Sequence, residues 1–142
     1  MTPAATVLVC ALDLLGRSPE SFPPIELLDV RPAHASVNAE AFVESGVHTI
    51  YLLTTSEVFR SALKATTRCG NRNALRKLAS VIVHEEWHVR HGSDEEGAYS
   101  AQLTTLAMLG GRDTPVYNNV QRAMVAVLSQ QRIARTNLVA RR

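Results

Sequence analysis

The chain has 142 residues, of which 46% are hydrophobic and 20% charged, an ordinary composition for one compact domain with a substantial core. Its formal net charge is only +2, and four arginines lie near the C-terminus at positions 132, 135, 141 and 142. The rest of the chain is therefore not basic enough to indicate a nucleic-acid-binding domain. The longest apolar run covers residues 7–12, far short of the roughly 20 residues of a membrane helix. We therefore expect a single domain over residues 1–142 without a membrane span.

The N-terminus and the cysteines bear on the cellular compartment. No basic residues precede the apolar stretch at the N-terminus, so a secretory signal is not favoured and the cytoplasm is expected. Cys10 and Cys69 lie far apart and form no Cys-x-x-Cys pattern, which predicts neither a disulfide framework nor a sulfur-based zinc site. Both are expected to be reduced thiols, Cys10 in a helix core and Cys69 in a loop.

The first half of the chain predicts one helix and three strands. Apolar residues at helical spacing indicate a helix over residues 4–16, which Gly16 ends. The aliphatic run at 25–30 predicts a buried strand between prolines. Residues 37–44 and 47–53 predict a β-hairpin around Ser45-Gly46, with the polar first arm at the sheet edge and 49–53 in the centre.

The second half is predicted to be helical. A short helix is expected over 56–65 and a long amphipathic one over 73–91, ended by Gly92. Ser93 and Glu96 fit a capping box that opens a helix reaching Gly110-Gly111, and Pro115 begins a last helix. The predicted class is α+β: an N-terminal helix, a small, mostly antiparallel three-stranded sheet and a helical half.

One motif in the long helix carries chemistry. His84-Glu85-Glu86-Trp87-His88 has the H-E-x-x-H pattern, and residues four apart project from the same helix face. His84 and His88 can therefore share a zinc ion. Glu85, offset by one position, would flank the metal and act as a general base that takes a proton from the attacking water.

A catalytic zinc requires a third protein ligand. Three of the residues that follow the motif are candidates. Glu95 is followed by the small residues Gly97 and Ala98, which would let two helices approach closely. Glu96 has a competing role in the predicted capping box. His91 lies three positions after His88 and is the other alternative ligand.

The segment from His84 to Tyr99 resembles the zincin metallopeptidases, specifically the gluzincin branch. In that branch a second helix supplies a glutamate ligand, often in a Glu-x-x-Ala pattern, which Glu95 and Ala98 match. The resemblance implies Glu95 as the third zinc ligand and a minimal zincin-like fold. Departures are the short spacing between His88 and Glu95, and Tyr99 in the place where some of these families have an acid.

The resemblance also implies how a substrate would be handled. A peptide or protein substrate would lie in extended form along the sheet edge, for which residues 38–44 are the candidate. A donor would stabilise the oxyanion on the attacked carbonyl, and Tyr99, Tyr117 or His48 are candidates. The expected function is a zinc-dependent metallopeptidase. The alternative is a catalytically idle zincin-like module that binds metal and acts through protein interactions.

Overall fold

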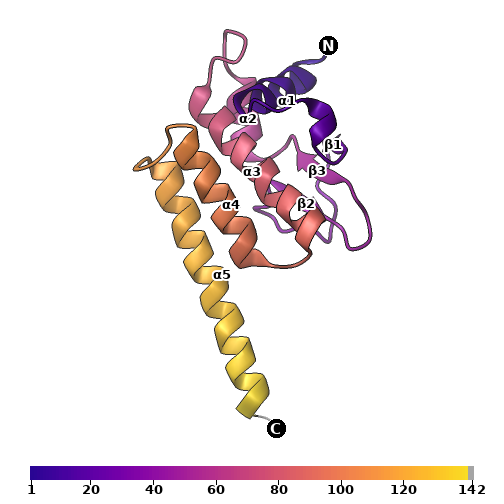
Figure 1. Cartoon of the computed structure of the whole chain (residues 1–142). Coiled ribbons are helices and arrows are strands. Elements are labelled where there is room, and N and C mark those ends of the chain that lie inside the picture. Colours follow the sequence, from indigo (N-terminus) through magenta and orange to yellow (C-terminus); the bar gives the residue numbers. More distant parts are fainter. Residues whose placement is uncertain (141–142) are drawn as a thin grey trace.

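The computed structural model describes residues 1–140, so Arg141 and Arg142 lie outside the described residues. The elements in chain order are α1 (Pro3–Leu14), the short 3₁₀ helix η1 (Pro19–Ser21), β1 (Ile25–Leu28), β2 (Ala41–Val43), β3 (Ile50–Leu53), α2 (Glu57–Leu63), α3 (Arg72–His91), α4 (Glu95–Met108) and α5 (Pro115–Ala140). The helices and the small sheet confirm the α+β class. Helix α3 runs through the middle of the molecule, α4 lies beside α3, and α5 lies beside α4 (Figure 1).

The sheet is mixed, which corrects the expectation of a mostly antiparallel one. Its order is β1-β3-β2, with β1 parallel and β2 antiparallel to β3. The chain after β1 crosses to the far side of β3 before it forms β2, and the residue pattern within each strand carries no information on this crossing. The central position of β3 is confirmed, since Ile50, Leu52 and Leu53 are almost completely buried.

Strand β2 leaves one backbone edge free. In the part of the chain that the structure describes, β2 pairs with β3 alone. The Leu53 amide donates to the Glu40 carbonyl at 3.0 Å, and Phe42 is the register partner of Tyr51. Because hydrogen-bonded pairs alternate in an antiparallel ladder, the backbone groups of Ala41 and Val43 face the free edge.

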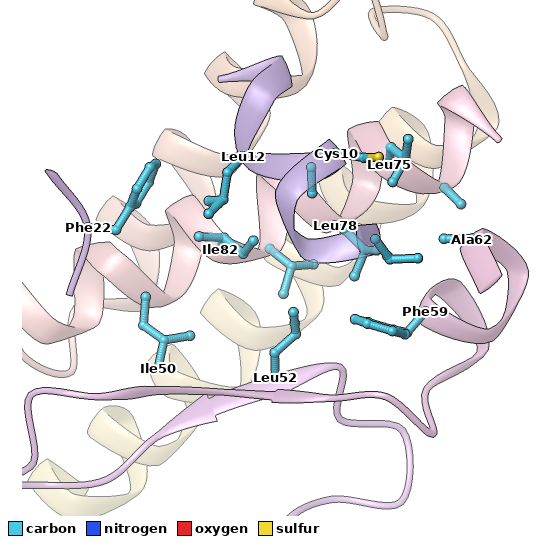
Figure 2. Close-up of a cluster of buried hydrophobic side chains, with 14 residues drawn as sticks. Cys10, Leu12, Phe22, Ile50, Leu52, Phe59, Ala62, Leu75, Leu78 and Ile82 are labelled. Carbon is cyan, nitrogen blue, oxygen red and sulfur yellow. The ribbon is translucent and has the colours of Figure 1, made fainter. Parts of the chain in front are cut away.

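The main core lies between the sheet, α1, α2 and α3. Ile50 and Leu52 point from the sheet toward Leu78 and Ile82 of α3, and Phe59 of α2 closes one side (Figure 2). All five side chains are almost fully buried. This packing fixes α3 on the sheet and thereby sets the position of its polar C-terminal half.

Helices α4 and α5 form a smaller apolar cluster of their own. Leu103 and Leu106 of α4 pack against Val120 of α5. Helix α5 has 26 residues, and its C-terminal part extends well past the body of the molecule (Figure 1). No helix within residues 1–140 has both the length and the apolar character needed to span a membrane.

The predicted capping box at the start of α4 is wrong by one residue. Asp94 is the N-cap, and its carboxylate accepts the Gly97 amide at 3.2 Å. Asp and Ser cap helices about equally well, so sequence could not decide between these neighbours. The shift makes Glu95 the first helical residue and frees Glu96 from any capping role.

The two cysteines form a disulfide, which corrects the expectation of reduced thiols. Cys10 of α1 and Cys69 have Cα atoms 5.6 Å apart and are linked. Cys69 adopts a positive φ of 57° in the loop before α3. The pair is 59 positions apart, so only the packing of α1 on α3 brings the two sulfurs together.

Candidate metal centre

Three side chains from two helices converge at one point. His84 and His88 of α3 bring their Nε2 atoms to 3.3 Å from each other. Glu95 of α4 contacts His88 Nε2 through Oε1 and lies 3.8 Å from His84 Nε2. One ligand atom from each residue falls within 4.8 Å of the others, so this group can hold a metal ion.

The other ring nitrogen of each histidine fixes which nitrogen faces Glu95. His88 Nδ1 lies 2.7 Å from the Gly92 carbonyl oxygen, and His84 Nδ1 lies 2.9 Å from Gln102 Oε1. A carbonyl oxygen only accepts, so each neutral imidazole must donate from Nδ1. Both Nε2 atoms therefore carry lone pairs directed at the convergence point.

This convergence of acceptors is suited to a bound cation. Burial lowers the pKa of His84, which favours the neutral imidazole. Two imidazole lone pairs and the Glu95 carboxylate then face one another with only 11, 12 and 26% of the three side chains exposed. Such a donor set fits a divalent cation, and two histidines with one glutamate is a set found in catalytic zinc sites.

The alternative third ligands lie elsewhere. Glu96 is exposed at the second position of α4 and is not part of the group of possible ligands. The His91 ring packs against the Trp87 ring at an angle of 35°, with centroids 4.1 Å apart, and is also outside the group. Of the three candidates, the fold brings only Glu95 to the two motif histidines.

Glu85 lies next to this group and is buried, with 9% of the residue exposed. Burial raises the pKa of Glu85 to about 7; Glu95 and Glu40 add to the rise, and His88 opposes it. A carboxylate with its pKa in this range is suited to proton transfer at neutral pH. A cation at the neighbouring group would favour its ionised form.

The three proposed oxyanion donors have different places. The Tyr99 ring meets the His84 ring edge-on at 4.6 Å, and Tyr99 and Glu85 line a common cavity. Burial and the nearby carboxylates raise the pKa of Tyr99, so its hydroxyl keeps its proton. His48 lines the cleft in front of the histidines, whereas Tyr117 packs in the cluster between α4 and α5.

A cleft of about 790 Å³ lies in front of the group. Residues 41–48 form one wall, and Gln131 of α5 belongs to another part of the lining. The wall includes Ala41 and Val43, whose backbone groups face the free edge of β2. The predicted polar arm thus lies beside the metal centre, with a strand edge available to an extended peptide.

Two supporting contacts could not be expected from the motif. Gln102, only 4% exposed, accepts from His84 through Oε1 and donates to Ser80 Oγ through Nε2 at 3.3 Å. Both the oxygen and the nitrogen of the Gln102 amide are therefore hydrogen-bonded. The signal in the sequence is its position seven residues after Glu95, which places it two turns along the same face of α4.

The other supporting contact is on the side of α3 that faces away from the histidines. Arg17 donates to both carboxylate oxygens of Glu86 at 2.7 and 2.5 Å, and Arg90 donates to the same carboxylate at 3.0 Å. Burial alone would raise the pKa of Glu86, but the hydrogen bonds from Arg17 and Arg90 outweigh it and hold the pKa below its ordinary value. Glu86 faces away from the histidines and anchors α3 to the segment after α1.

No family model, curated protein or solved structure matches the chain.

Proposed function

We propose that the protein is a zinc-dependent peptidase. The observation that carries the proposal is the convergence of His84, His88 and Glu95 beside the buried carboxylate of Glu85. The cleft in front of this group and the free edge of β2 support a peptide substrate. The donor set favours zinc among the common divalent ions.

Each residue has a chemical role in this proposal. When bound, zinc would supply Lewis acidity that polarises the scissile carbonyl and acidifies water. Glu85 takes the proton of the attacking water and passes it to the leaving amine. Tyr99 donates a hydrogen bond to the carbonyl oxygen as negative charge develops there. Ala41 and Val43 hold the substrate backbone along β2.

The metal half of the proposal is tested by metal content and affinity. We expect about one zinc per chain in the wild type and little in His84→Ala. Glu95→Gln should lower zinc affinity by about tenfold or more, because it damages the metal shell. Glu96→Gln, one residue along α4 and exposed, is the matched control and should bind like the wild type. Equal losses in the two glutamine variants would contradict the assignment of Glu95.

The catalytic half is tested by Glu85→Gln, which keeps the shape of the side chain but cannot take a proton. We expect the variant to retain zinc and to lose cleavage by about 100-fold or more. Cleavage of an unstructured protein and of a mixed peptide library is followed by mass spectrometry. Undiminished cleavage by the variant would remove the mechanism. A zinc-loaded wild type that cleaves nothing would favour a metal-binding module without turnover.

A further inference from the structure

A second cavity adjoins the metal centre, and most of the residues that line it have no role in the proposed mechanism. Its volume is about 220 Å³, and Ala41, His84 and Glu85 line both this cavity and the main cleft. Since Glu85 borders it, the cavity lies next to the position proposed for the scissile bond. A peptide that follows β2 past the metal centre would bring one of its side chains to this place.

The size and walls of the cavity suit a single side chain. Small-molecule pockets have volumes of roughly 300–1,000 Å³, which is more than this cavity offers. Its lining comes from the segment before β2 and from α3, α4 and α5, including Glu40, Lys77, Tyr99 and Asn119. Four separate parts of the fold therefore form one small polar cavity.

An ion pair dominates the chemistry of the lining. Lys77 Nζ of α3 lies 3.6 Å from Glu40 Oε1, and 19 and 31% of the two side chains are exposed. The pair presents a cationic donor and an anionic acceptor side by side. A ligand group that carries both a donor and an acceptor and no net charge can bind both members of the pair without separating them.

This requirement distinguishes between substrate side chains. A carboxylate would meet Lys77 but also the carboxylates of Glu40 and Glu85. An ammonium group would meet Glu40 and Glu85, but Lys77 would repel it and compete with it for Glu40. An aliphatic side chain would take water from the ion pair and return no hydrogen bond. A carboxamide can accept from Lys77 and donate to Glu40, so it leaves the pair intact.

We propose that this cavity binds the carboxamide of a substrate glutamine or asparagine beside the scissile bond. The position relative to the bond rests on the proposed peptidase function. The recognition of the carboxamide by Lys77 and Glu40 does not, because it requires binding only.

The experiment measures binding without turnover. Pools of eight-residue peptides carry Gln, Glu, Lys or Met at one central position and random residues elsewhere. Their affinities are measured by fluorescence anisotropy for the zinc-loaded Glu85→Gln protein and, because Glu85 itself lines the cavity, also for the zinc-free wild type. We expect the Gln pool to bind about tenfold more tightly than the Met pool, and more tightly than the Glu and Lys pools.

The cavity is tested by adding Lys77→Met, which should remove the preference for Gln over Met. Lys77→Gln keeps a donor, guards against a failure to fold and should retain part of the preference. The matched control is Lys64→Met, which removes the same charge from an exposed position outside the cavity lining and should change nothing.

The outcomes separate the two proposals. Equal affinities for all pools, no binding of any pool, tightest binding of a charged pool or an unchanged preference in Lys77→Met would each overturn the carboxamide inference. A Gln preference that depends on Lys77, together with a wild type that cleaves none of the pools, would overturn the peptidase proposal and support the inference.

Discussion

The orientation of the two motif histidines depends on unlike acceptors. His88 is held by the Gly92 carbonyl at the end of α3, a backbone group in a conformation with φ of 78° that favours glycine. His84 is held by the side chain of Gln102, which can be removed by mutation. The two interactions have the same geometric purpose, since each leaves Nε2 unprotonated and directed at Glu95.

Replacing Gln102 should therefore weaken metal binding without touching a ligand. Gln102→Met keeps the length of the side chain but removes the acceptor, so the His84 ring loses its fixed tautomer. We expect zinc affinity to fall by about tenfold or more, as measured by competition with a chromogenic chelator. Thr104→Met, at an exposed position on the same helix, is the control. An unchanged affinity in Gln102→Met would show that the hydrogen bond does not orient the ligand.

Glu86 predicts a pH-dependent contribution to stability. Its carboxylate is held by Arg17 and Arg90, whose side chains are 36 and 52% exposed, so we expect Glu86→Gln to lose only about 1–2 kcal/mol at pH 7. The folded pKa of Glu86 lies below its unfolded value of about 4.3. The contribution is therefore complete above the unfolded pKa and is lost as the pH falls through the folded pKa.

Urea unfolding of wild type and Glu86→Gln at several pH values checks this dependence. The difference in free energy of unfolding should be constant from pH 6 to 8 and shrink toward pH 3. Titration of the other carboxylates is common to both proteins and cancels in the difference. A gap that stays constant down to pH 3 would mean that the shape of Glu86 matters and its charge does not.

Among the elements, α3 and α4 must approach closely for Glu95 to reach the histidines. Gly97 is the point of contact, because a Cβ atom built there would collide with the Trp87 ring. We expect Gly97→Ala to push α4 away from α3 and to lower both the free energy of unfolding and zinc affinity. Overpacking costs about 1–3 kcal/mol, which outweighs the gain of up to about 1 kcal/mol in helix propensity.

The measurements for Gly97→Ala are urea unfolding and a zinc titration. Ser100→Ala, exposed on the same helix, is the control and should equal the wild type. If Gly97→Ala were more stable than the wild type and bound zinc equally well, the close approach of the two helices at this point would be wrong.

The sequence predicted the elements more securely than it predicted the contacts between them. Apolar spacing located α3 to within one residue at its start, and the four-residue spacing of His84 and His88 placed both on one face. Periodicity did not identify Glu95, which came from a family resemblance. Gln102 was missed because a buried glutamine has no pattern of its own until its partner is known.

For the whole molecule, long-range organisation was the least predictable. The crossing from β1 to the far side of β3 makes the sheet mixed, and strand patterns do not encode strand order. The same holds for Cys10 and Cys69, whose pairing depends on how α1 packs on α3. A disulfide is typical of an oxidising compartment, in contrast to the cytoplasm expected from the N-terminus.

The disulfide leads to a prediction about the whole molecule. It closes a loop between residues 59 positions apart, and a loop of this length stabilises the folded state by about 4 kcal/mol through the entropy of the unfolded chain. Reduction should therefore lower the urea midpoint strongly. It should leave zinc content unchanged under native conditions, because Cys69 precedes α3 while the metal ligands lie in its C-terminal half and on α4.

The double variant Cys10→Ala/Cys69→Ala is the control, since it should unfold at the same urea concentration with or without reductant. Thiol titration of the unfolded wild type should detect no free thiol before reduction. Free thiols before reduction, or an unchanged midpoint after it, would contradict a stabilising link between α1 and the loop before α3.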